Sequence, residues 1–93
     1  MTDTEKLEKA KSRIGISVGI GIYDEEIISL LADAEQDMIA AGVPASIKED
    51  DAFFNTQMLY VRAWLGNDRT DTNRYMTAYR EKVFRLTLEG GGT

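Results

Sequence analysis

The sequence contains no cysteine and no histidine, and it has a single proline. Without cysteine the chain forms no disulfide and offers no thiolate to a metal ion. It therefore differs from a small secreted disulfide scaffold and suits a reducing compartment. Without histidine it lacks the commonest general base and the commonest zinc ligand. These absences argue against an enzyme or a metalloprotein, and we expect no catalytic residue, no metal and no cofactor.

Long apolar runs are also missing. No stretch approaches the roughly 20 apolar residues that a membrane-spanning helix needs, and the first residues are polar and charged, unlike a secretory signal. We therefore expect an intracellular, soluble protein with no membrane contact. The 93 residues predict one domain over residues 1–93 with a small core. Association with further copies or with a partner is an expected source of extra stability.

The charge is acidic overall and unevenly distributed. The net charge is −5, which argues against tight binding to a phosphate backbone. Residues 1–51 hold twelve acidic and five basic side chains, a net charge of −7, whereas residues 52–93 hold four and six, a net charge of +2. This asymmetry describes either a solvated surface or acidic and basic faces that meet between copies.

The stretch from Ser46 to Gly66 carries more apolar and aromatic side chains at helical spacing than any other. Ser46 with Glu49 three residues later predicts a capping box at its start, and Gly66 predicts its end. The apolar surface is too wide for one neighbouring helix to cover, so we expect a central helix. Two lines form this surface: Phe54, Met58, Val61 and Leu65, and beside them Phe53, Tyr60 and Trp64.

Three further helices are predicted around this central one. The first is short and spans residues 2–13 with Thr2 as its N-cap, and the second begins at Asp24. The last is capped by Asp71 or Thr70 and runs to about Leu88. The predicted buried stripes are Leu7, Ala10 and Ile14 in the first, Ile27, Leu31, Ala34 and Met38 in the second, and Met76, Tyr79, Val83 and Leu86 in the last.

The segments between these helices also carry predictions. Gly42, Val43 and Pro44 predict a firm end to the second helix, with Val43 packed against its last turn. Residues 15–23 contain three glycines and predict a loop whose isoleucines and Val18 are buried against the body. Residues 90–93 are expected to be a flexible tail.

Two short motifs are candidate sites. Gly15, Ser17 and Gly19 fit a nucleophile pattern, but no strand-to-helix elbow is predicted there and no histidine is present to activate the serine. The adjacent carboxylates 49–51 suggest a magnesium site, but neighbouring positions on a helix point about 100° apart, so they fit a helix N-terminus better. Neither motif supports a catalytic or metal-binding function.

The basic residues allow two interpretations. Arg62 in the central helix is either solvated or forms an ion pair with another subunit. The last helix combines basic residues with tyrosines, which is compatible with nucleic-acid binding but is also typical of any amphipathic helix with a positive outer face. Together the four helices predict an all-α fold, a small four-helix bundle with a short first helix and a central apolar third helix.

The order of these features resembles the phage head-tail connector proteins, also called adaptor or head-completion proteins. The resemblance covers residues 4–88. It rests on a short first helix with a Gly-Ile turn, the segment DEEIISLLADAE at 24–35, a Gly-x-Pro break, a long helix ending in Tyr60, Arg62 and Trp64 with NDR at 67–69, and a last helix.

The resemblance implies a non-enzymatic structural virion protein that assembles in the host cytoplasm into a ring of copies beneath the portal. Its partners would be further copies, the portal protein and a tail-completion protein, with DNA passing through the channel without specific binding. The alternative is a small acidic helical module that regulates a partner bound to its second helix. For the ring we expect contacts of Asp33 and Asp37 with Arg62, Arg80 or Arg85 of a neighbouring copy.

Overall fold

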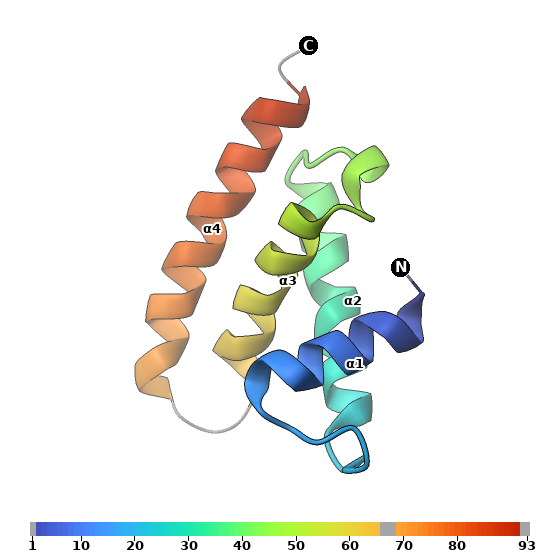
Figure 1. Ribbon diagram of the computed structural model, residues 1–93. Helices are drawn as coiled ribbons and strands as arrows, with labels where there is room; N and C mark the ends of the chain where they lie inside the picture. Colours follow the sequence, from blue (N-terminus) through green and yellow to red (C-terminus); the bar gives the residue numbers. More distant parts are fainter. Residues whose placement is uncertain (1, 66–68, 92–93) are drawn as a thin grey trace.

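The computed structural model describes residues 2–65 and 69–91. These ranges form four α-helices and one short 3₁₀ helix, with no strand among them, which confirms the all-α prediction. The helices are α1 (Asp3–Ile14), α2 (Asp24–Ala40), α3 (Asp51–Trp64) and α4 (Arg69–Gly91), and the 3₁₀ helix η1 (Ala45–Ile47) lies between α2 and α3 (Figure 1).

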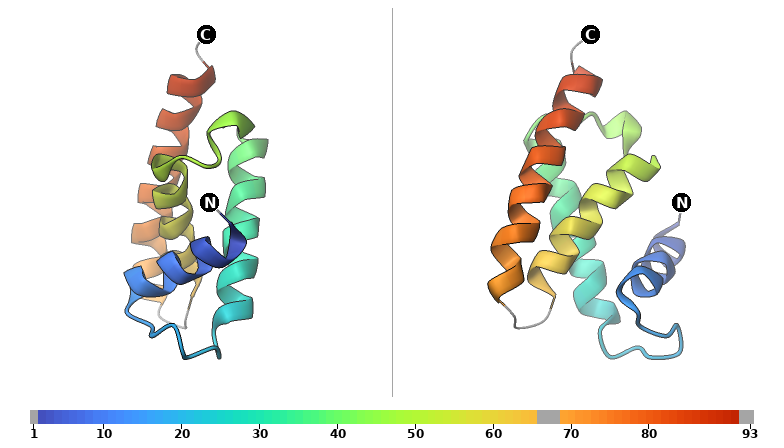
Figure 2. Two further views of the ribbon diagram at one scale, coloured as in Figure 1. Left: turned by 45° about the vertical axis from the view of Figure 1, so that its right-hand side comes forward. Right: turned by 60° about the vertical axis from the view of Figure 1, so that its left-hand side comes forward.

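Helix α3 is the centre of the bundle, as predicted. It contacts each of the other three α-helices, and it lies between α2 and α4 while the short α1 crosses the lower part of the molecule (Figures 1 and 2). Phe53, Phe54 and Val61 are fully or almost fully buried on different sides of this helix. Burying each phenyl ring contributes about 2 to 3 kcal/mol of transfer free energy.

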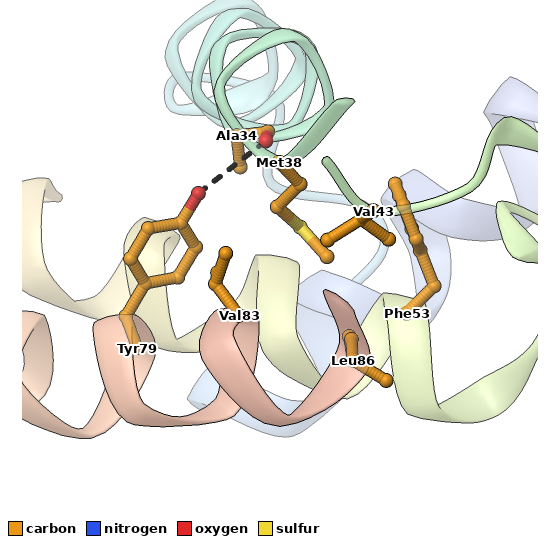
Figure 3. Close-up of a cluster of buried hydrophobic side chains, with 7 residues drawn as sticks. All are labelled: Ala34, Met38, Val43, Phe53, Tyr79, Val83 and Leu86. Atoms are coloured by element: carbon orange, nitrogen blue, oxygen red, sulfur yellow. Dashed lines mark hydrogen bonds between the residues drawn. The ribbon is translucent and has the colours of Figure 1, made fainter. Parts of the chain in front are cut away.

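Two clusters of buried side chains lie on the two sides of α3. The first joins α2, α3 and α4 (Figure 3), and the Tyr79 hydroxyl lies 3.4 Å from the Ala34 carbonyl within it. The second joins α1, α2 and α3. All four predicted stripe residues of α2 are buried, which confirms the helical spacing. The first cluster contains Ala34, Met38, Val43, Phe53, Tyr79, Val83 and Leu86, and the second contains Ala10, Ile27, Leu31, Phe54, Met58 and Val61.

The predicted start of α1 and the predicted end of α2 are confirmed. The Thr2 hydroxyl accepts a hydrogen bond from the backbone N–H of Glu5 at 3.1 Å and so caps α1. Gly42 has φ of 109°, and the backbone N–H of the following Val43 donates to the Met38 carbonyl at 3.0 Å. Because Val43 is also buried, the chain turns away from α2 at a fixed point.

The predicted start of the central helix is wrong. Ser46 lies in η1, and α3 begins at Asp51 with Asp50 as N-cap and no side-chain capping bond. After Pro44 the chain makes a 3₁₀ turn, in which Lys48 N–H donates to the Ala45 carbonyl, and this turn places Ile47 against the first cluster. Burial of Ile47 therefore prevails over the local capping box.

Three predictions about the outer parts differ from the structure. Trp64, expected on the buried surface, is 48% exposed at the last turn of α3, with its ring centroid 6.4 Å from that of Tyr60. Thr70 and Asp71 lie inside α4 and do not precede it, because the helix already starts at Arg69. Helix α4 also continues past Leu88 to Gly91, since each added residue contributes a backbone hydrogen bond and no proline stops it. Gly66 and residues 92–93 lie outside the described residues.

Candidate interaction surfaces

The residues predicted to form a subunit interface are all exposed, but the structure divides them between separate places. Asp37 of α2 and Arg80 of α4 line the same hollow of about 340 Å³ between these two helices. Arg62 of α3 lines another hollow, together with Arg13 and Asp71. An acid and an arginine expected to pair between copies therefore lie side by side within one molecule.

Asp37 has a structural partner in its own chain. The buried Tyr79 hydroxyl donates to Oδ2 of Asp37 at 2.7 Å. Burial raises the pKa of the Tyr79 phenol, and the hydrogen bond to the carboxylate raises it further. The pKa of Tyr60 is also raised, first by burial and then by the charges of Asp33 and Asp37. Asp37 thus anchors α4 to α2, which its position in the sequence did not indicate because Tyr79 lies 42 residues away.

Arg62 also has a role within the chain. Its Nη2 donates to the backbone carbonyl of Arg13 at 3.0 Å, one of the carbonyls left free at the C-terminus of α1. Arg13 in turn places its guanidinium over the Phe54 ring, 5.0 Å from the centroid, and donates to the Asn55 side chain. Arg62 therefore fastens the end of α1 to α3, an arrangement that neither sequence-based interpretation included.

The remaining two interface candidates lie on open surface. Arg85 is 3.5 Å from Glu81 on the same helix, and both side chains are largely exposed. Such a pair contributes about 0.3 to 0.5 kcal/mol to stability. Breaking it therefore costs little when Arg85 contacts another molecule. Asp33 is exposed on α2, and its charge acts on Tyr60.

Lys11 holds the loop between α1 and α2. Its side chain is only 2% exposed, and its Nζ lies 2.8 Å from Oδ1 of Asp24 at the start of α2. The same ammonium donates to the carbonyls of Val18 at 3.0 Å and Ile20 at 2.5 Å. One buried cation therefore satisfies two loop carbonyls and a carboxylate, and it fixes the loop to both helices. Before the fold is known, Lys11 is only one lysine in a basic helix, so this role could not be predicted.

The expected burial of the apolar loop residues is wrong. Val18 is 61% exposed and Ile22 is 80% exposed, and Ile20 and Tyr23 are also exposed. Only Ile16 packs against the second cluster. The polar contacts of Lys11 order the backbone, so the loop keeps its shape without burying its apolar side chains. Near the C-terminal end of α4, Phe84 and Leu88 are a second pair of exposed apolar side chains.

The described residues show no arrangement suited to metal binding or hydrolysis. No group of three or more metal-binding side chains occurs in residues 2–65 and 69–91. Ser17 is an exposed loop residue, and no strand precedes it to form a nucleophile elbow. No helix in these same ranges is long and apolar enough to cross a membrane.

The comparison with known families supports one of the two functions expected from the sequence. The family model described as phage connector protein matches residues 7–93, nearly the whole chain. The chain belongs to the phage connector protein family. This confirms the resemblance to head-tail connectors, and it makes the chain a phage connector-like structural protein, a component of the virion. No curated protein and no solved structure matches the chain.

Proposed function

We propose that this connector assembles with copies of itself into a ring beneath the portal and joins the DNA-filled head to the tail. The family match over residues 7–93 carries the proposal. Two features of the molecule support it: a small core, and two exposed apolar surfaces at separate places on a chain of 93 residues. Exposed apolar patches of this kind mark protein contact sites.

The proposed partners are further copies, the portal protein and a tail-completion protein, and the proposed place of assembly is the host cytoplasm. The surface charge fits a ring through which DNA passes. With a net charge of −5, the protein repels phosphate, so a duplex slides through without adhering. We expect no salt-sensitive DNA binding at micromolar protein in a gel-shift titration, and tight binding there would contradict this part of the proposal.

Charge pairs between copies belong to the same proposal. Because Asp37 bonds to Tyr79 and Arg62 bonds to Arg13, replacing either residue also disturbs the fold. Asp33 and Arg85 give the cleaner test, since both are exposed and neither has such an internal role. Asp33→Arg is expected to weaken assembly, and the double reversal with Arg85→Asp is expected to restore part of it. Absence of recovery in the double variant removes this pair.

The experiment that tests the function is deletion of the gene from the phage or prophage that carries it. The proposal predicts that lysates then contain separate heads and free tails in electron micrographs, and that the gene supplied in trans restores joined particles. Joined, infectious particles without the protein would contradict the proposal. They would favour the other candidate, a regulatory module that binds a partner through the acidic α2.

A further inference from the structure

The loop at residues 15–23 is ordered although its apolar side chains face outward. Val18, Ile20 and Ile22 are exposed by 61%, 49% and 80% of their surface. Ordering a backbone costs about 1 to 2 kcal/mol per residue. Here the hydrogen bonds of Lys11, the turn hydrogen bonds of the loop backbone and the packing of Ile16 offset part of that cost, while Val18, Ile20 and Ile22 contribute no burial. Placing an ammonium in the interior also has a desolvation cost. The result is a rigid apolar projection, and rigidity lowers the entropy lost when such a surface binds.

A second exposed apolar surface lies on α4. Phe84 and Leu88 are 62% and 59% exposed and lie one helical turn apart on the same face. Beside them is the hollow between α2 and α4, which Phe84 itself lines with Val83 and Ala41. This surface therefore offers a ring and a depression to a partner.

The two surfaces lie at opposite ends of the molecule. The loop is at the lower end in every view, beside the start of α2, whereas Phe84 and Leu88 belong to the last part of α4 at the upper end (Figures 1 and 2). The 17-residue α2 runs between the two ends and spans roughly 25 Å. Two such surfaces on one chain allow a head-to-tail contact, which repeats from copy to copy.

The charges beside the two surfaces are opposite. Glu26 lies in the first turn of α2, four residues after the loop residue Ile22. Asp33 lies two turns further along the same exposed face, which continues to Asp37 beside the hollow. On α4, Arg80 precedes Phe84 by one turn, and Arg85 follows it. The acceptor also carries acids, because Asp37 lines the hollow with Arg80 and Glu81 lies 3.5 Å from Arg85. Among the described residues Glu26 and Arg80 are in no ion pair. A second copy, which brings Glu26 of its loop end to Arg80, is therefore the partner that fits best.

We propose that the loop at residues 15–23 of one copy packs against Phe84 and the α2–α4 hollow of the next. This inference deepens the proposed function and rests on it, because it names the contact that joins neighbouring copies. The contact is heterologous: Ile22 and Val18 supply the apolar projection, Phe84 and Leu88 supply the acceptor, and Glu26 meets Arg80 at its edge.

Cysteine cross-linking tests the contact directly, because the chain has no cysteine of its own. Ile22→Cys and Phe84→Cys are made as two separate proteins, mixed in equal amounts and mildly oxidised. A disulfide forms only where the Cα atoms approach within about 7 Å. We expect the mixture to form the mixed dimer at least about tenfold faster than either protein alone forms a homodimer. The double variant is expected to give a ladder of multiples of the 10.4 kDa chain on a non-reducing gel.

The matched control is Lys82→Cys, an exposed position on the other side of α4 from Phe84. Its mixture with Ile22→Cys is expected to cross-link only at the collision rate. Equal rates for the two mixtures would overturn the contact, and preferential homodimers of Ile22→Cys would replace it by a loop-to-loop contact. If native mass spectrometry then still shows closed oligomers, the contact fails and the ring survives. If the gene deletion leaves joined particles, the function itself fails.

Discussion

The two loops that flank α2, residues 15–23 and 42–50, begin in the same way and end differently. After α1, Gly15 has φ of 80° and the N–H of Ile16 donates to the Lys11 carbonyl; after α2, Gly42 has φ of 109° and the N–H of Val43 donates to the Met38 carbonyl. Each helix thus ends in a left-handed glycine followed by a β-branched residue. Beyond that point the loop at 42–50 packs Val43 and Ile47 inward, whereas the loop at 15–23 exposes Val18, Ile20 and Ile22.

The difference lies in the contacts that order the backbone of each loop. In residues 42–50, burial of Val43 and Ile47 holds the backbone, so the apolar side chains are consumed by the fold. In residues 15–23 a buried cation holds the backbone, so the apolar side chains remain available to another molecule. The loop at 42–50 therefore stabilises the fold with its apolar side chains, and the loop at 15–23 leaves its own exposed. Each of the following changes tests one side of this contrast.

The largest effect is expected for Lys11→Met. The substitution leaves Asp24 and the carbonyls of Val18 and Ile20 without their cation, at a cost of about 3 kcal/mol in unfolding free energy. Urea unfolding followed by circular dichroism measures the loss. The control is Lys9→Met on the same helix, whose exposed ion pair with Asp51 contributes less than about 1 kcal/mol. Equal losses for both variants would show that Lys11 does not hold the loop.

The next prediction compares the effects of truncating one apolar residue in each loop. Val43→Ala removes two buried methyl groups and is expected to cost about 2 kcal/mol of unfolding free energy. Ile22→Ala removes more carbon from a side chain that is 80% exposed, and it is expected to change stability by less than about 0.5 kcal/mol. A large loss for Ile22→Ala in the monomer would mean that the loop is packed against the body after all.

A smaller effect, with opposite signs, is expected at two glycines. Gly42→Ala places a Cβ on a backbone with φ of 109° and is expected to destabilise by about 1 to 2 kcal/mol. At Gly19 nothing lies within 4 Å of an added Cβ, so Gly19→Ala is expected to be neutral or to stabilise by about 0.5 kcal/mol through the unfolded chain. Thermal unfolding of both variants beside the parent chain checks the signs, and destabilisation by Gly19→Ala would contradict the open loop.

The smallest effect is a pH dependence at the C-terminal end of α2. Burial and the bond to Asp37 raise the pKa of Tyr79. In the unfolded chain tyrosine ionises near pH 10, so the contribution of the neutral phenol is complete below about pH 10 and is lost as the pH rises toward the folded pKa. At about pH 10.5 the loss is below about 1 kcal/mol. Tyr79→Phe is expected to remove most of this loss of stability, and Tyr60→Phe, at a less buried tyrosine, a smaller part. Urea unfolding midpoints below pH 10 and at about pH 10.5 measure the loss in each variant.

The parts of the fold that sequence reasoning predicted are those set by local geometry. The stripe of α2 follows from a spacing of three and four residues, and the ends at Thr2 and Gly42 follow from backbone donors and φ angles that only certain residue types satisfy. Membership of the connector family could also be predicted, because it depends on the order of such elements along the chain. Each of these features is determined by residues close together in the sequence.

The features that escaped prediction depend on contacts between distant residues. Lys11 reaches the start of α2 across the loop, Asp37 meets Tyr79 42 residues away, and Arg62 meets Arg13 49 residues away. A sequence shows that such side chains are charged, but not which backbone groups they face once folded. For that reason the loop was expected to be buried, and two of the proposed interface residues proved to be anchors within the chain.

The central claim is that this connector joins its neighbours head to tail through a loop kept rigid by a buried lysine. Electron cryomicroscopy of the junction between head and tail in intact virions tests it most directly. The account predicts a closed ring of this chain below the portal, with Val18 and Ile22 of each copy against Phe84 of the next. A junction without the protein, or a ring in which that loop faces solvent, would contradict it.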